Sequence, residues 1–509
     1  MNTTVVFVHG WSVTNTDTYG RLPERLTNEG ARHGLTIETK EIHLGRYISF
    51  HDEVRVKDIA RAFEAAVRDK DQLGPLLAGG HRFVCITHST GGPVIREWWR
   101  RYYQSSGAPV CPMSHLIMLA PANYGSALAI LGKGKLSRMN SWFRGVEPGQ
   151  GVLDWLALGS APAWHLNEAW IKRGAKHIGP KGVFPFVITG QSIDRKFYDS
   201  LNSYTGELGS DGVVRVAAAN LQANYVRLVQ QAPVPMPGEA GQYHAPELKL
   251  DKNLSAAKTP LRIVKDASHS GNDKGIIKSV RAAAGTKKNQ PTVDAIFSCI
   301  TVKTKGDYSA VAEAFDAASA QVQQEERLEV ESKIFREKTY FIHDSFSMVV
   351  FRVTDHEGYP VSDFDLMLTA GSDSDPNHLP KGFFADRQLN SINRNTVTYY
   401  INHSIMTGCE AVYYREKNKP DVVVRPRLVG TKFLGFQIVA RPDEGFARYM
   451  PCSITASTDV LKAVIAPNAT TMVDIVLRRV VGEGTFHLDK GIDAHGFKRT
   501  KPGKPLADE

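Results

Sequence analysis

The sequence is poor in cysteine, and the few that occur form no recognisable motif. Five are spread over 509 residues, at positions 85, 111, 299, 409 and 452, without a C-x-x-C pair. Zinc sites and disulfide frameworks need closely spaced or evenly paired cysteines, so this pattern argues against both. Cys85 stands in the apolar run Phe83–Ile86, where we expect a buried thiol.

Long hydrophobic runs are also missing. No stretch approaches the roughly eighteen apolar residues of a membrane span. The N-terminus passes from Met1–Thr4 straight into a short apolar strand, with no basic or cleavable leader. We therefore expect a protein that is cytoplasmic in the producing cell, or one exported by a route that uses no Sec signal.

Arginine-rich arms and zinc-finger spacings are absent as well, although the formal net charge is +9. Basic residues are scattered, with only short clusters such as Lys133/Lys135 and Lys287–Lys288. We predict no nucleic-acid partner. A mildly basic surface is compatible with peripheral contact to anionic membrane lipids.

Tryptophan is absent from the second half of the chain. All seven tryptophans precede residue 171. At 509 residues the chain exceeds one ordinary hydrophobic core. We predict a first, α/β domain over residues 1–285, a turn-rich linker at 286–295, a β-rich domain over 296–480 and a polar tail from 481 to 509.

The first 285 residues alternate short apolar runs with helical patterns, which is typical of a mostly parallel sheet covered by helices. Helical spacing marks residues 54–68 and 93–103, and 273–283 is helix-like. Expected strands are residues 5–8, 35–44, 83–86, 116–119, 184–189 and 261–264. The predicted fold class is α/β, with a mostly parallel sheet covered by helices.

Past the linker, period-2 or apolar runs separated by turn residues favour a β-sandwich. Residues 296–302 read as an opening strand, and about 308–338 as a charged helix. The later expected strands are residues 347–353, 363–368, 396–401, 433–440 and 471–477.

Ser89 lies between the strand 83–86 and the helix that begins near Pro93, in the turn Thr87–Gly91. A serine on such a turn is exposed for attack, and Gly91 and Gly92 let strand and helix approach closely. Thr87 departs from the usual glycine. The alternative is a serine that caps the following helix.

Nucleophilic serine needs a base held by an acid. Asp211 lies in the glycine-flanked turn Gly209–Val214, and His269 lies in a small-residue loop just after the strand 261–264. Asp194 is the second candidate for the acid and His244 for the base. An insertion at about residues 222–258 would explain the long spacing from Asp211 to His269.

His9-Gly10-Trp11 ends the first strand, where an oxyanion loop is expected. The backbone N–H groups of Trp11 and Thr90 are the predicted oxyanion donors. His9 is a possible substrate contact, and His88 is expected to support the serine turn.

Residues 123–181 interrupt the sheet pattern with apolar and aromatic residues, among them Trp142 and Trp155, interleaved with basic ones. Such a segment suits a lid that meets an acyl chain and an anionic interface. A cap with its own small core is the alternative.

These motifs occur in the same order as in the α/β-hydrolase lipases and esterases, which residues 4–283 resemble. The resemblance implies hydrolysis of a carboxylic ester through an acyl-enzyme on Ser89, with Asp211 and His269 completing the triad. The architecture is also similar to phospholipase effectors of type VI secretion, which implies a lipid ester substrate and, as partners, a secretion apparatus or an immunity protein. An esterase or thioesterase for soluble acyl substrates, and a non-catalytic binding protein, remain alternatives.

No cofactor is expected. The loop Gly371–Asn377 offers Asp373 and Asp375 as oxygen ligands for Ca²⁺. An ordinary turn is the competing interpretation.

Overall fold

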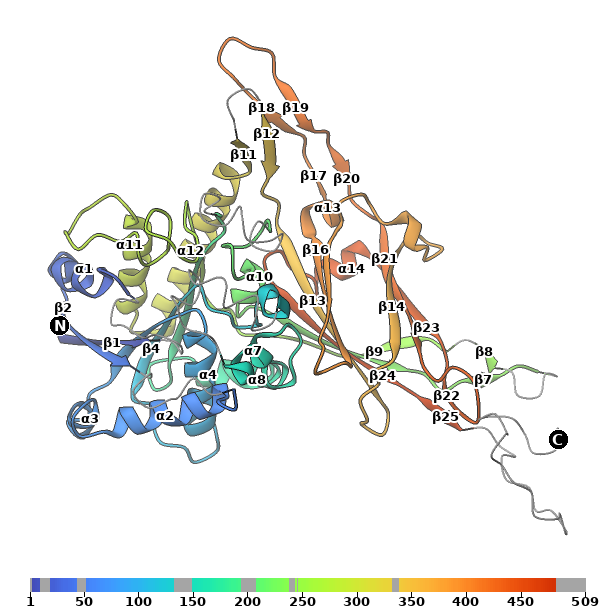
Figure 1. The fold of residues 1–509 in the computed structure, drawn as a ribbon, viewed down its shortest axis with the longest axis horizontal. Coiled ribbons are helices and arrows are strands. Elements are labelled where there is room, and N and C mark those ends of the chain that lie inside the picture. The colour runs from blue at the N-terminus through green and yellow to red at the C-terminus, as the bar shows by residue number, and fades with distance from the viewer. Residues whose placement is uncertain are drawn as a thin grey trace.

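The computed structural model describes residues 2–9, 19–43, 52–131, 149–193, 207–237, 243–244, 246–331 and 338–481. Their elements form two units that lie side by side, with the early helices around one sheet and the later strands beside it (Figure 1). One cluster of buried apolar side chains centres on the first unit and includes Met348, Tyr400 and Met472 of the second, and the other cluster lies within the second unit. The expected polar tail from residue 482 onward lies outside the described residues.

A six-stranded sheet in the order β10-β5-β4-β3-β1-β2 is the centre of the first unit. Every neighbouring pair in it is parallel. Its strands are β1 (Asn2–His9), β2 (Thr36–His43), β3 (Phe83–His88), β4 (Met113–Leu119), β5 (Phe184–Gly190) and β10 (Leu261–Val264). Strands β3, β4, β5 and most of β1 are continuous apolar runs, as expected where helices cover both faces, whereas the edge strand β2 is mostly polar.

Helices cover both faces of this sheet (Figure 1). One face carries α1 (Leu22–Glu29), α11 (Gln290–Ile300) and α12 (Lys305–Glu325), and the other carries α2 (Val56–Arg68), α3 (Gly74–Ala78) and α4 (Gly91–Tyr103). The shorter elements are the 3₁₀ turns Gly30–His33, Ala127–Leu131 and Gly174–His177, with α7 (Gln150–Leu156), α8 (Ala161–Arg173) and α10 (Val216–Ala219).

The second unit is a sandwich of a mixed six-stranded sheet and an antiparallel three-stranded one. The larger sheet runs β15 (Phe384–Leu389), β16 (Thr396–Asn402), β13 (Phe346–Asp355), β24 (Thr470–Leu477), β6 (Asn224–Gln230) and β9 (Leu248–Ser255). The smaller runs β14 (Phe364–Ala370), β21 (Phe433–Ala440) and β23 (Cys452–Ser457). Alternating apolar side chains of both sheets form the second core.

Short elements decorate the sandwich. Two helices, α13 (His403–Thr407) and α14 (Thr458–Lys462), lie at its end, with the 3₁₀ turn Pro376–His378. Small two-stranded pairs complete it: β7 (Val234–Pro235) with β8 (Tyr243–His244), β11 (Leu328–Glu331) with β12 (Thr339–Ile342), β17 (Gly408–Cys409) with β20 (Leu428–Val429), β18 (Val412–Tyr414) with β19 (Val422–Arg425), and β22 (Ala447–Tyr449) with β25 (Arg479–Val481).

The fold class predicted from the sequence is confirmed, including the insertion expected near residues 222–258. Strands β6 and β9 pair with each other outside the first sheet, and β6 also pairs in parallel with β24, one of the last strands of the chain. The chain therefore crosses from the first unit into the second and returns, and β6 and β9, which lie between Asp211 and His269 in the sequence, belong to the sandwich.

Three expected elements differ in the structure. Residues 296–302, expected as a strand, belong mostly to α11, because Val293, Ile296, Phe297 and Ile300 follow helical spacing and pack in the first core. Helix α12 ends at Glu325, well before residue 338. Residues 273–283, expected to be helix-like, form turns.

The first core continues past the boundary that the sequence suggests near residues 286–295. Helix α11 begins at Gln290, and side chains as late as Val322 on α12 belong to the first core. The domain limits themselves stay a prediction. In the part of the chain that the structure describes, no helix combines the length and apolarity needed to cross a bilayer.

Candidate active site

Ser89 holds a left-handed backbone conformation, with φ of +52°, directly between β3 and α4. A left-handed non-glycine residue is uncommon and is kept only where its surroundings determine it. Here the Ser89 N–H donates to the Leu119 carbonyl at 3.0 Å, and the Ser89 carbonyl accepts from the Gly92 N–H at 3.2 Å. The turn therefore projects the serine beyond the carboxyl edge of the sheet.

The glycines after Ser89 explain how Thr87 fits where the usual motif has glycine. A Cβ on Gly91 would lie 3.2 Å from the Thr87 Cβ, tighter than ordinary contact, so the missing side chain leaves room for the buried threonine. A Cβ on Gly92 would lie 2.7 Å from the Pro121 Cβ. Only glycine allows α4 to start this close to the sheet.

The structure brings Ser89, His269 and Asp211 together. The Ser89 Oγ lies 3.1 Å from Nε2 of His269, and Nδ1 of the same ring lies 2.9 Å from Oδ2 of Asp211. Asp211 is fully buried and His269 is 2% exposed. Each hydrogen bond is within ordinary length, so the imidazole is held between hydroxyl and carboxylate.

The acid turn fixes the Asp211 carboxylate by backbone donors. Its Oδ1 accepts from the N–H groups of Val213 at 3.0 Å and Val214 at 2.8 Å, which leaves Oδ2 for the histidine. The His269 N–H donates to the Asp211 carbonyl at 2.9 Å. Main-chain and side-chain hydrogen bonds therefore both hold Asp211 and His269 in position relative to each other.

The loop that carries His269 is supported from β5 and from the end of α12. The Ala267 carbonyl would lie 1.8 Å from a Cβ on Gly190, so β5 must end in glycine for the loop to cross it. The carboxylate of Glu326, just beyond α12, accepts from the Asp266 N–H at 2.6 Å and from the Ser192 hydroxyl at 3.2 Å. This carboxylate ties the end of α12 to the histidine loop.

His88 and Thr90 flank the serine in the structure. The His88 ring lies 4.7 Å from the His269 ring, centre to centre, consistent with the expected support of the turn. Thr90 is the residue before the first turn of α4, where N–H groups favour an anion. His9 is the last residue of β1 and pairs with His43. Trp11 and Trp142 lie outside the described residues.

Other candidates lie elsewhere. Trp155 on α7 is 4% exposed and belongs to the first core, so its role as a substrate contact stays a prediction. His244 lies in β8, where it pairs with Val234 away from the triad. Asp194 is outside the described residues.

A buried ion pair that was not predicted from the sequence lies next to the acid turn. Arg215 follows Asp211 by four residues, and its side chain is 1% exposed. It donates to both carboxylate oxygens of Glu207 at 2.7 Å and to Asp386 of β15 at 2.5 Å. Burial acts to lower the pKa of this guanidinium, but the carboxylate of Glu207, with Tyr400 and Asp386, raises it overall. The arginine thus stays charged and joins the acid turn to the sandwich.

Tyr400 of β16 contributes to the same junction. Its ring lies under the Arg215 guanidinium, 4.1 Å from centre to carbon, and its hydroxyl donates to the Leu208 carbonyl at 3.0 Å. The sequence separation of 191 residues between Tyr400 and Gly209 hides this contact from any local pattern. The sequence signal that could have pointed to the junction is an arginine four residues after the candidate acid.

The loop predicted as a possible calcium site is compact. Ligand atoms of Asp373, Asp375 and His378 all lie within 4.8 Å of one another. Asp375 accepts from the Asn377 N–H at 2.8 Å, as in an ordinary Asx turn, and His378 lies 3.1 Å from Asp373. A calcium site at this loop stays a prediction, and a titration that leaves thermal stability unchanged would remove it.

Among solved structures, the chain is strongly similar to a bacterial phospholipase. The chain is 39% identical to phospholipase PlaB from Legionella pneumophila, with a TM-score of 0.82 over 99% of each chain. PlaB in complex with thio-NAD gives 38% identity and a TM-score of 0.81 over 99% of this chain and 100% of that one. Bacillus licheniformis lipase BlEst2 is 16% identical over 43% of this chain and 79% of its own, with a TM-score of only 0.31. No protein-family model and no curated protein sequence matches the chain.

The parallel sheet, the left-handed serine turn and the similarity to PlaB define the class: this is an α/β-hydrolase and an ester hydrolase of the lipase and phospholipase kind. Identity at this level over nearly the whole of both chains also shows the family. The chain belongs to the family of Legionella pneumophila phospholipase PlaB.

Proposed function

We propose that the chain hydrolyses a carboxylic ester of a lipid through an acyl-enzyme on Ser89. The observation that carries the proposal is the continuous hydrogen-bond chain from Ser89 through His269 to Asp211, buried at its acid end. The resemblance to a phospholipase supports a phospholipid as the ester.

In this mechanism the Ser89 Oγ attacks the ester carbonyl carbon while its proton passes to Nε2 of His269. Asp211 keeps the Nδ1 proton in place and stabilises the imidazolium. The tetrahedral intermediate collapses, the C–O bond to the alcohol breaks, and His269 returns the proton to the leaving oxygen. Water, deprotonated by the same imidazole, then attacks the acyl carbon. The bond from this carbon to the Ser89 Oγ breaks, His269 returns the proton to Oγ, and a fatty acid is released.

The oxyanion of each tetrahedral intermediate needs two donors. We assign this role to the N–H of Thr90, at the start of α4, and to that of Trp11. The helix N-terminus supports the first assignment, because its dipole stabilises negative charge.

Ser89→Ala tests the mechanism directly. We expect fatty-acid release from mixed phospholipid liposomes to fall by at least about 10⁴-fold, since the nucleophile is lost. Ser309→Ala, an exposed serine on α12, serves as the matched control. Equal release by wild type and Ser89→Ala would contradict the mechanism and favour the non-catalytic alternative for this site.

The nature of the acyl substrate is tested separately. A panel of phospholipids with different head groups, run beside soluble p-nitrophenyl and thioester substrates, separates a lipid-specific enzyme from an esterase or thioesterase. Higher turnover on dispersed lipid than on the soluble esters is expected. Turnover confined to soluble esters would favour the alternative.

Location and macromolecular partners rest on the architectural similarity alone. We propose cytoplasmic residence in the producing cell with export by a type VI apparatus, and an immunity protein as a partner. Detection of the protein in culture supernatant, lost when the apparatus is deleted, is the expected result. Secretion unaffected by that deletion would contradict it.

We also propose that the chain binds a nicotinamide dinucleotide, because PlaB, similar over the whole chain, was solved in complex with thio-NAD. The proposal concerns binding only. A rise in melting temperature with NAD, absent with AMP, is expected. No rise with any nicotinamide dinucleotide would contradict it.

A further inference from the structure

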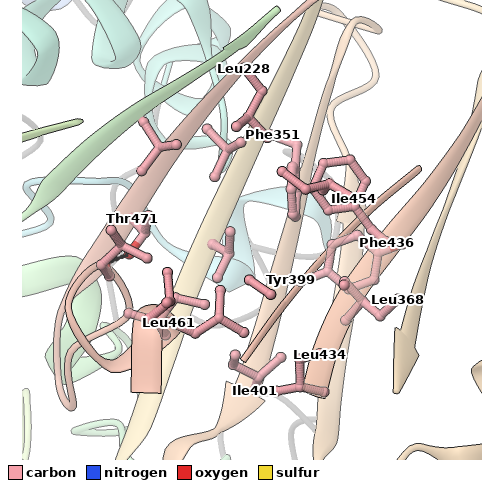
Figure 2. Close-up of a pocket in the computed structure, with 18 of the residues that line it drawn as sticks. Leu228, Phe351, Leu368, Tyr399, Ile401, Leu434, Phe436, Ile454, Leu461 and Thr471 are labelled. Atoms are coloured by element: carbon pink, nitrogen blue, oxygen red, sulfur yellow. Dashed lines mark hydrogen bonds between the residues drawn. The ribbon is translucent and has the colours of Figure 1, made fainter. Parts of the chain in front are cut away.

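The sandwich encloses an apolar cavity between its two sheets. Side chains from β13, β16, β24 and β6 face those from β14, β21 and β23 across it (Figure 2). The space measures about 210 Å³. Protein cores normally leave few voids larger than a water molecule, so a cavity of this size is a specific feature of the second core.

The walls of the cavity offer no free polar group. Of the described residues that line it, only Tyr399 and Thr471 carry polar side-chain atoms. The Tyr399 hydroxyl donates to the Leu366 carbonyl at 2.5 Å, and the Thr471 hydroxyl donates to the Val464 carbonyl at 2.6 Å. Water needs polar partners to occupy a buried site, so the cavity favours an apolar guest.

The cavity reaches the surface beside β9 and α14. Two of its lining residues are more than half exposed, Leu250 at 58% and Val460 at 60%. Around them Leu461, Val464 and Ile465 are only partly buried and pack on the second core. An apolar guest could enter here and leave its polar end in solvent.

From this geometry we propose that the sandwich is a second lipid-binding site, which takes the alkyl chain of a fatty acid with the carboxylate outside. The occupant follows from the chemistry of the chain, because an ester hydrolase of the lipase kind produces fatty acids. A cavity of about 150 Å³ accommodates benzene, so by proportion this one holds roughly eight or nine carbon atoms. The site does not require the Ser89 mechanism.

Calorimetric titration of the full chain with saturated fatty acids of increasing length, each below its micelle concentration, tests the proposal. Burial of one methylene contributes about a fourfold gain in affinity. We expect that gain for each added carbon up to roughly eight or nine carbons, followed by a plateau. Absence of saturable binding, or affinity that rises without a plateau, would overturn the inference.

Two variants on opposite faces of β23 locate the binding. Ala456 lines the cavity and pairs with Leu434, whereas Ser453 is exposed and pairs with Gln437. Ala456→Phe fills the space and is expected to weaken binding by about tenfold or more, the loss of two or more methylenes of contact. Ser453→Phe should leave it unchanged. Equal affinities in the two variants would place the fatty acid elsewhere and refute the proposal.

A variant that enlarges the cavity provides an independent test if Ala456→Phe does not fold. Phe436→Leu removes part of an aromatic wall, so the plateau should move to chains about two carbons longer. An unchanged plateau contradicts the assignment.

Ser89→Ala separates this inference from the proposed mechanism. It should lose ester hydrolysis and keep the chain-length profile of fatty-acid binding. Loss of hydrolysis without any fatty-acid binding refutes the cavity alone, whereas retained hydrolysis refutes the mechanism alone.

Discussion

The carboxyl edge of the first sheet and the interior of the sandwich differ in how they place polar atoms. At the edge, Asp211 is fully buried, yet backbone donors and His269 occupy its oxygens. In the sandwich, the polar atoms of Tyr399 and Thr471 turn away from the cavity to backbone carbonyls.

This difference has an energetic basis. A buried polar group is costly when unpaired, so a paired network holds a single arrangement and loses much when one member is removed. Apolar contacts are non-directional, and an incompletely filled core tolerates changes of volume better than changes of polarity. The first region suits chemistry that needs fixed geometry, and the second suits a guest of variable length.

The largest expected effect comes from breaking the network at its acid. Asp211→Asn should lower kcat by about 10⁴-fold, because an amide cannot hold the imidazole in the required tautomer. Steady-state ester hydrolysis measures it. Asp273→Asn, whose side chain is 86% exposed, is the matched control and should be neutral. A loss below tenfold in Asp211→Asn would point to a different acid.

The junction between the two regions comes next. Arg215→Met leaves the carboxylates of Glu207 and Asp386 buried without their partner, and should lower the free energy of unfolding by about 3–5 kcal/mol. Urea unfolding measures the loss. The triple variant with Glu207→Gln and Asp386→Asn should recover part of it, whereas equal stability of the single and triple variants would argue against a charge effect.

An exposed pair gives the comparison for this prediction. Arg227 and Asp251 form an ion pair in the same sandwich, with 3.2 Å between Nη1 and Oδ2, and their side chains are 36% and 40% exposed. Arg227→Met should cost no more than about 1 kcal/mol. A cost close to that of Arg215→Met would mean that burial does not set the size of the effect.

Acid should weaken the first unit through His115, which lies on β4 against the α11–α12 connection. Burial lowers the pKa of this imidazole to about 4 from 6.5, although the hydrogen bond to the Val302 carbonyl acts the other way. Between pH 6.5 and about 4, His115 is therefore protonated in the unfolded chain and neutral in the folded chain. The contribution of neutral His115 to the free energy of unfolding is present above pH 6.5 and is lost as the pH falls toward 4.

The expected loss from His115 is roughly 3 kcal/mol across this window. Denaturant unfolding at a series of pH values measures it. His115→Gln should flatten the profile between pH 6.5 and about 4, while the surface variant His81→Gln should keep it. Parallel profiles for wild type and His115→Gln would exclude His115 as the source.

The smallest expected effect compares the packing of the two cores. Ile117→Val in the closely packed β4 should cost about 1 kcal/mol, whereas Ile401→Val, at the cavity wall, should cost nearer to about 0.5 kcal/mol. Both are measured by urea unfolding. A larger cost at Ile401 would mean that its surroundings are as tightly packed as those of β4.

Local patterns in the sequence are enough to predict most elements of the first unit and the order of its site residues. Strands such as 261–264 and the helix from Pro93 are visible because apolar runs, periodicity and turn residues act over a few neighbours. The strand-turn-helix context of Ser89 is local in the same way, and so are the turns that carry Asp211 and His269.

Features that depend on residues far apart in the chain follow from tertiary contacts and are not visible in local patterns. The short apolar run in 296–302 is compatible with helix or strand, and packing against the first sheet selected the helix. Tertiary contacts also set the room for Thr87 beside Gly91, the pairing of Arg215 with Asp386, and the parallel addition of β6 to β24. The apolar cavity belongs here too, because it arises from side chains that meet only when two sheets pack face to face.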